Sequence, residues 1–90
     1  MNRYGEQAMT HWKEHKPQAF GELESPEEFF TELGEEISGA IETRARELAG
    51  PEPEGEGYLQ RLQRLSSSRL TAEGEVLRER VLLDMEPDRE

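Results

Sequence analysis

One segment, residues 26–49, constrains the fold of this 90-residue chain more than any other feature. Ser25 can cap a helix that begins there, Pro26 suits the first helical position, and Glu28 completes the pattern of a capping box. Gly50-Pro51 marks the end, because glycine favours a helix C-terminus and proline cannot continue the helix. These signals predict a helix of 24 residues, which is about 36 Å long.

The helix predicted at 26–49 is amphipathic, with its glutamates opposite one broad apolar stripe. The stripe consists of Phe29, Phe30, Leu33, Ile37, Ala40, Ile41, Ala45 and Leu48. Arg44 interrupts the stripe. Gly34 and Gly39 each cost about 1 kcal/mol relative to alanine in a helix, so we expect them to permit close approach by another backbone. A stripe of this length needs a second element to cover it.

A second long helix is predicted at residues 57–84, after a linker at 50–57 that is acidic and has no apolar residue. Its apolar stripe consists of Leu59, Leu62, Leu65, Leu70, Val76, Leu77, Val81 and Leu83. The charged residues that intrude on this stripe are Arg69, Glu73 and Arg80. Leu82 points away from it and is expected to be exposed. The alternative to one continuous helix is a break, with a new helix starting near Ser68 or Thr71.

A short first helix is predicted at residues 3–15. Its apolar face is formed by Tyr4, Ala8 and Trp12. Pro17 ends this helix, and residues 17–24 form a connector. The junction between the first two helices is expected to contain Tyr4, Trp12, Phe29 and Phe30. The alternative for Trp12 is an exposed anchor for a partner.

The predicted fold class is all-α: a long antiparallel helical hairpin plus a short N-terminal helix. Residues 1–84 are expected to form one small helical domain, and residues 85–90 a frayed tail. Leu, Ile, Val and Phe together account for only 17 of the 90 residues. Because this core is small, we expect a second copy of the chain, or a larger complex, to complete it.

The sequence offers little of the chemistry that enzymes use. It has no cysteine and therefore no thiolate nucleophile. Its glutamates lie along one exposed helix and share the same surroundings, whereas acid–base catalysis needs carboxylates in unlike environments. Gly55-Glu56-Gly57 lacks the lysine and the preceding strand of a phosphate-binding loop. We expect no catalytic residues, no cofactor and no enzymatic activity.

One pattern with a metal-binding precedent occurs at residues 11–15, His-Trp-Lys-Glu-His. It matches the H-x-x-E-H pattern of inverted zinc metallopeptidases, in which two histidines one turn apart chelate the metal. The chain is far shorter than such a catalytic domain, so we expect His11 and His15 to be structural and to bind no metal. The alternative is zinc binding by these two histidines at a dimer contact.

Charge is the most lopsided property of the chain, with a net charge of −10 at pH 7. Residues 21–56 contain twelve acidic and two basic side chains, whereas the only charges within 57–72 are Arg61, Arg64 and Arg69. One interpretation is that these arginines pair with the acidic helix across the hairpin. The other is that the glutamates form a surface that binds a basic partner. The candidate partner-binding residues are Glu28, Glu32, Glu35, Glu36, Glu42, Glu52, Glu54 and Glu56.

Short motifs in the first two-thirds of the chain carry a family resemblance. They are Arg3-Tyr4-Gly5, His11-Trp12 with Pro17, Phe29-Phe30 with Leu33-Gly34-Glu35-Glu36, Leu48-Ala49-Gly50-Pro51 and Gly55-Glu56-Gly57-Tyr58-Leu59. With these motifs the chain resembles short open reading frames of actinobacterial prophages and integrative elements. The resemblance implies a small accessory protein of mobile DNA that modulates a larger nucleic-acid enzyme. It implies no catalytic residues.

These observations predict a small acidic, non-enzymatic interaction protein that binds a basic, nucleic-acid-handling protein and blocks or regulates it. A nuclease, a helicase or a CRISPR-type effector would suit such a charge mimic. The alternative is a structural or assembly subunit of a helical homo-oligomer or multi-protein complex. The strongly negative charge disfavours direct binding to nucleic acid or to an anionic membrane. We expect a cytoplasmic protein that forms a homodimer or joins a larger complex.

Overall fold

The structure is a computed structural model that describes residues 1–83. Four α-helices follow one another: α1 (Arg3–His15), α2 (Pro17–Gly21), α3 (Pro26–Ala49) and α4 (Tyr58–Leu77). A π-helical run, η1 (Arg78–Leu83), continues α4 without a break. The described part of the chain contains no strand, so the all-α fold class is confirmed.

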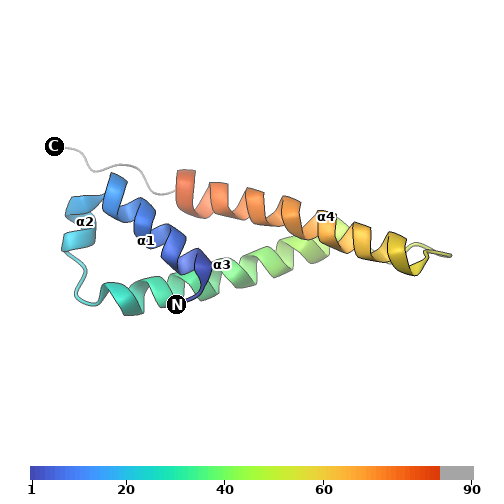
Figure 1. Cartoon of the computed structure of the whole chain (residues 1–90), viewed down its shortest axis with the longest axis horizontal. Coiled ribbons are helices and arrows are strands. Elements are labelled where there is room, and N and C mark those ends of the chain that lie inside the picture. Colours follow the sequence, from blue (N-terminus) through green and yellow to red (C-terminus); the bar gives the residue numbers. More distant parts are fainter. Residues whose placement is uncertain (84–90) are drawn as a thin grey trace.

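The two long helices α3 and α4 lie antiparallel and form a hairpin that is joined by the linker at residues 50–57 (Figure 1). Helix α1 packs against α3 near the open end of this hairpin, and α2 turns the chain from α1 into α3 (Figure 1). The molecule is a rod of 56 × 23 × 16 Å. Because α1 is shorter than α3, it covers only one half of the hairpin.

The observed bounds of α1 and α3 coincide with the helices predicted at 3–15 and 26–49. The last predicted helix, 57–84, corresponds to α4 followed by η1, and it continues through the serines and Thr71 where a break was the alternative. Residues 84–90, including the predicted tail, and the side chain of Leu82 lie outside the described part. The predicted connector at 17–24 contains the short helix α2, which begins at Pro17. Proline cannot continue the preceding helix, but it suits the first position of a new one.

The helix ends differ in part from the predicted caps. Asn2 caps α1: its Oδ1 accepts a 2.9 Å hydrogen bond from the Gly5 N–H, which the sequence analysis did not predict. Ser25 occupies the N-cap position of α3, but its side chain makes no capping hydrogen bond, so the predicted capping box is wrong. Gly50 ends α3 with a φ of 66°, a left-handed conformation that favours glycine.

The core lies between the three main helices and is built around Phe30. The buried apolar side chains are Tyr4, Ala8, Phe30, Ile37, Ile41, Ala72, Val76 and Val81. Trp12 is half-buried, and its ring centroid lies 5.4 Å from that of Phe30 and 5.3 Å from that of Phe29. The predicted aromatic junction is therefore present, although Phe29 also reaches the surface.

Two glycines allow α1 to approach α3 closely. A Cβ atom added at Gly34 would lie 2.8 Å from the backbone nitrogen of Gly5, a distance too short for a non-bonded contact. Asn2 strengthens the same junction, because its Nδ2 donates a 3.0 Å hydrogen bond to the Gly34 carbonyl oxygen. The expectation of close approach therefore holds for Gly34. It is wrong for Gly39, where an added Cβ atom would meet no described atom outside its own helical backbone within 4 Å.

Within the described side chains, the predicted apolar stripe of α4 is buried only from Val76 onward; the side chain of Leu83 lies outside the described part. Leu59 and Leu70 are 71% and 70% exposed, and Leu62 and Leu65 are 44% and 41% exposed. Leu70 is exposed because its position on α4 points away from the face that contains the buried Ala72 and Val76. For the residues at the start of α4 the register of the hairpin matters: Arg64 Nη1 donates a 2.8 Å hydrogen bond to the carbonyl oxygen of Ala49, the last residue of α3. The first turns of α4 therefore extend past the end of α3 (Figure 1).

Of the charged residues that interrupt the predicted stripes, Arg44, Glu73 and Arg80 have ion-pair partners, whereas Arg69 has none among the described residues. Arg44 donates to Glu75 at 2.7 Å and to Glu79 at 3.1 Å. Arg80 pairs with Glu36, and Glu73 pairs with Arg3. The pairs of Arg44 and Glu36 join α3 to α4 and η1 and hold the register of the hairpin, whereas the Arg3–Glu73 pair joins α1 to α4.

A candidate protein-interaction surface

Four glutamates form a line along the solvent face of α3, and we call them the acidic stripe: Glu28, Glu32, Glu35 and Glu42. All four side chains are exposed, because their positions lie opposite the buried face that contains Phe30, Ile37 and Ile41. The stripe covers fourteen helical steps, or about 21 Å. Within residues 1–83, none of these carboxylates has a hydrogen bond or an ion pair.

The other four predicted site residues are placed differently. Glu36 is exposed but pairs with Arg80, and Glu52 accepts a 3.0 Å hydrogen bond from Arg61. Glu54 is exposed in the linker and has no ion pair with another described residue. The structure thus brings together only half of the eight glutamates as an unpaired surface.

Glu56 differs from the other candidate residues, because its carboxylate is paired and largely covered. Arg64 Nε and Nη2 donate to its two carboxylate oxygens at 2.7 and 2.9 Å, and the Glu56 side chain is only 5% exposed. These hydrogen bonds lower the pKa of Glu56, so the carboxylate stays ionised. The pair fixes the linker to α4 and serves the fold.

The expected pairing of the basic half of α4 with α3 does not occur at the stripe. Arg61 and Arg64 pair with linker glutamates. The ion pairs that join α3 to the end of α4 and to η1 involve Arg44 and Glu36 of α3. Both residues lie at the edges of the face of α3 that packs against α4. The acidic stripe therefore keeps its full negative charge.

A partly exposed aromatic residue, Phe29, lies beside the stripe. Two shallow hollows meet at Phe29: one is also lined by Glu28 and Glu32, and the other by Leu33 and Glu36. An aromatic side chain among carboxylates combines apolar contact with charge, which is a common composition for a protein-binding surface. Phe29 was predicted to lie in the apolar stripe and in the aromatic junction, because the helical period alone does not distinguish a residue at the edge of an apolar face from one at its centre.

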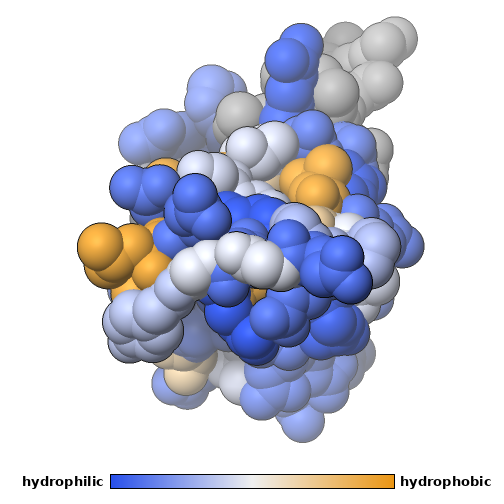
Figure 2. All heavy atoms as spheres, turned by 90° about the vertical axis from the view of Figure 1, so that its right-hand side faces the viewer, coloured by the Kyte–Doolittle hydropathy of each residue, from blue (hydrophilic) through white to orange (hydrophobic). Residues whose placement is uncertain are grey.

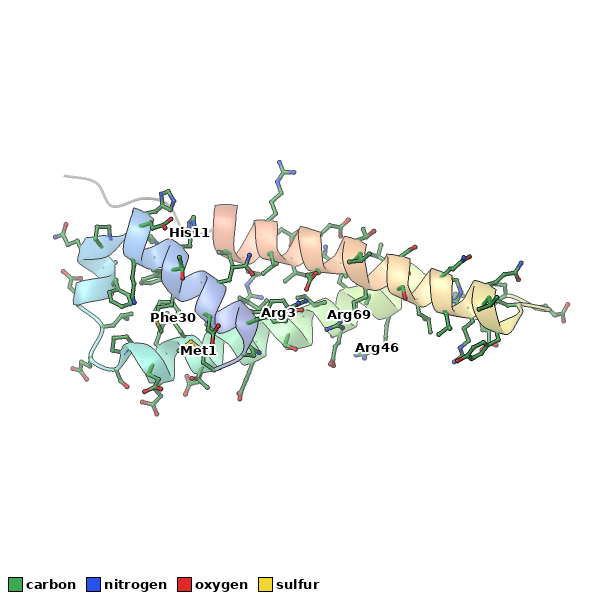
Figure 3. All side chains as sticks on the ribbon, viewed as in Figure 1. Met1, Arg3, His11, Phe30, Arg46 and Arg69 are labelled. Carbon is green, nitrogen blue, oxygen red and sulfur yellow. The ribbon has the colours of Figure 1, made fainter. Side chains whose placement is uncertain are left out.

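A second surface feature lies at the linker end of the molecule and was not predicted. It is a groove of about 590 Å³ between the C-terminal part of α3 and the N-terminal half of α4. Arg46 from α3 and Arg69 from α4 line it together with Leu65 (Figure 3). Neither arginine makes an ion pair with a described carboxylate.

The two histidines lie one turn apart on α1, with His11 half-buried and His15 exposed. Their ring centroids are 4.5 Å apart, and His11 borders a hollow of about 350 Å³ that is also lined by Glu14, Leu77 and Val81. Among residues 1–83, no group of three or more His, Cys, Asp or Glu side chains is arranged to hold a metal ion. In the same part of the chain, no helix is long and apolar enough to cross a membrane.

Comparisons with protein-family models, with curated proteins and with solved structures give no match for this chain.

Proposed function

We propose that this is a non-enzymatic interaction protein whose acidic stripe binds the basic surface of a nucleic-acid-handling protein and blocks or regulates that protein. One observation carries the proposal: Glu28, Glu32, Glu35 and Glu42 stand in a line of about 21 Å, exposed and without a described counter-ion. A nuclease, a helicase or a CRISPR-type effector has a cationic groove that would accept such a line of charges.

The spacing of the charges supports a mimic of a nucleic-acid strand. One strand of duplex DNA carries a charge about every 3.4 Å along the axis, and four carboxylates over about 21 Å give roughly half that density. The helix fixes the backbone positions of the four glutamates before binding, so only their side-chain rotamers need to be ordered on binding. Binding of this kind accelerates association and weakens with added salt.

Phe29 would add specificity to this charge-based contact. A basic surface that binds nucleic acid also has flat apolar areas for bases, and an aromatic ring beside carboxylates can occupy one of them. The proposed partner is therefore a basic protein, and the proposed location is the cytoplasm. An assembly subunit is the alternative function, and the exposed leucines of α4 favour it.

The test compares two variants that remove the same charge. The first changes the stripe, Glu28→Gln/Glu32→Gln/Glu35→Gln/Glu42→Gln. The control changes four exposed glutamates outside it, Glu6→Gln/Glu14→Gln/Glu22→Gln/Glu47→Gln. Tagged wild-type protein, stripe variant and control are used to capture proteins from the native host, followed by mass spectrometry. The captured protein is then assayed for binding to DNA or RNA in the presence of each version.

We expect wild type and control to capture a basic nucleic-acid-binding protein and to reduce its binding to nucleic acid, and the stripe variant to do neither at physiological salt. The affinity of wild type should fall steeply with salt. Equal capture and inhibition by the stripe variant would refute the proposal. Loss of capture only when leucines of α4 are changed would favour the assembly function.

A further inference from the structure

We infer that the linker end of the hairpin is a homodimer interface, at which the first turns of α4 pack against the same turns of a second copy. The surface is an apolar patch on α4, which we call the distal patch: Tyr58, Leu59, Leu62, Leu65 and Leu70. This inference is independent of the proposed function, because the patch and the acidic stripe share no residue.

The distal patch exists because nothing in the described chain covers it. Helix α3 ends at Ala49, whose carbonyl oxygen accepts the hydrogen bond from the Arg64 side chain, and the start of α4 with Tyr58 and Leu59 extends past it (Figure 1). Helix α1 reaches α4 through Arg3 and Tyr4, which bond to Glu73, three residues after Leu70. Among residues 1–81, most of the exposed large apolar side chains therefore belong to residues 58–70 of α4. Figure 2 views this end, where hydrophobic side chains reach the surface in separate groups among hydrophilic ones.

The area of the patch suits a dimer. A large side chain presents on the order of 150–250 Å² when fully exposed. The exposed fractions of the five residues run from 41% to 76%, so the patch presents roughly 500 Å². A standard interface buries about 800 Å² on each partner, of which about 60% is non-polar. The patch thus supplies the non-polar part of one standard interface.

The distribution of charge favours a second copy of the chain as the partner that binds this surface. The chain has a net charge of −10, so two copies repel each other over most of their surfaces. The linker end is the exception. Residues 45–72 contain four arginines and four glutamates and are neutral overall: Arg46, Arg61, Arg64, Arg69, Glu47, Glu52, Glu54 and Glu56. Two copies can therefore meet at this end without repulsion.

The unpaired charges at this end are also self-complementary. Arg46 and Arg69 have no described ion pair, and neither does Glu54 in the adjoining linker. In a two-fold arrangement each copy offers both signs to the other, and two-fold dimers are the commonest oligomers. The two acidic stripes would face away from the contact, so the dimer would present two of them.

The first experiment measures mass in solution. Sedimentation equilibrium should give twice the 10.4 kDa of the chain at micromolar concentration. Leu59→Lys/Leu62→Lys should weaken dimerisation at least about 100-fold, because each change occurs twice in the interface. The control is Ser67→Lys/Thr71→Lys, which adds the same charge at exposed positions on the other side of α4 and should leave the dimer intact. A monomeric wild type, or a leucine variant that dimerises as tightly as the control, overturns the inference.

The second experiment locates the contact. The chain has no cysteine, so Gln63→Cys and Glu22→Cys each give one site for a spin label. A label at residue 63 should report a short distance between copies. Residue 22 lies near the other end of a 56 Å rod. Labels there should be too far apart in the dimer for a distance between copies to be measured. Short distances at residue 22 would overturn the inference even if the leucine variant failed to fold.

Salt distinguishes this interface from a contact between the acidic stripe of one copy and the arginines of another. An apolar, neutral contact should persist from about 0.1 M to about 1 M NaCl, over which the screening length falls from about 10 Å to about 3 Å. Dissociation over this range would assign self-association to the charged surfaces and refute the proposed patch.

Discussion

The Tyr4 hydroxyl donates a 2.7 Å hydrogen bond to Oε2 of Glu73, which joins α1 to α4 across 69 residues of sequence. The Arg3 guanidinium donates to the same carboxylate oxygen and, at 3.2 Å, to the Tyr4 hydroxyl. The hydrogen bond from Tyr4, assisted by the charge of Arg3, lowers the pKa of Glu73. This three-residue cluster holds the N-terminal helix over the hairpin.

Removing the Tyr4 hydroxyl tests that link. We expect Tyr4→Phe to lower the free energy of unfolding by about 1 kcal/mol, because Glu73 loses a donor at a partly buried site while the ring stays in the core. Chemical denaturation followed by circular dichroism measures the change. Tyr58→Phe is the matched control, because the Tyr58 side chain is largely exposed at the start of α4. An equal effect of both substitutions would mean that the Tyr4 hydrogen bond contributes nothing to stability.

Acidification should destabilise the protein through Glu73 and Glu56. Folding lowers the pKa of both carboxyl groups, so their contribution is complete above the ordinary glutamate pKa of about 4.3 and is lost as the pH falls through the folded-state pKa. The variant Glu56→Gln/Glu73→Gln should be less stable than wild type at pH 7 and should lose less stability between pH 7 and pH 3. Thermal melts across this range provide the comparison, and parallel curves would contradict the assignment.

The two glycines inside α3 should respond in opposite directions to alanine. Gly34→Ala places a Cβ atom against the Gly5 backbone and should cost about 1–3 kcal/mol, as overpacking does. Gly39→Ala meets no atom within 4 Å and should stabilise the helix by up to about 1 kcal/mol. The free energy of unfolding of the two variants should therefore lie on either side of wild type. A stabilising Gly34→Ala would show that α1 does not pack on α3 in this way.

Leu62 and Val81 fall on the same predicted stripe, but the structure separates them. Val81 is buried among the core residues, so Val81→Asp should abolish the folded state by placing an unpaired charge in the core. Leu62 lies at the surface, and Leu62→Asp should leave the helical content of the chain unchanged. Circular dichroism and thermal melts separate the two outcomes. A folded Val81→Asp variant would contradict the described packing of η1.

His11 and His15 are predicted to be structural. The double variant His11→Gln/His15→Gln should retain the fold with only a modest loss of stability, and zinc should not raise the melting temperature of wild type. Scanning calorimetry with and without zinc measures both effects. A zinc-dependent rise in the melting temperature that disappears in the double variant would restore the metal-binding alternative.

Several local features were predictable because their causes are local. Asn2 at the start of α1 escaped prediction, yet helices 3–15 and 26–49 were identified to the residue from period, Pro26 and Gly50. The exposure of the acidic stripe was predictable for the same reason. Glutamates opposite an apolar helix face are exposed once that face packs against another helix. The predicted interaction with a basic partner stays a prediction.

The amino-acid sequence by itself determined the helices, their order and the solvent face of α3, because caps, turns and amphipathic period act within a few residues. Only the tertiary structure decided the register of α4 against α3. An eight-residue linker allows several registers, and the one adopted buries the small residues Ser68 and Ala72 and gives Arg44 its carboxylate partners. That choice depends on contacts between residues far apart in the sequence, and it leaves Leu59 and Leu62 beyond the end of α3.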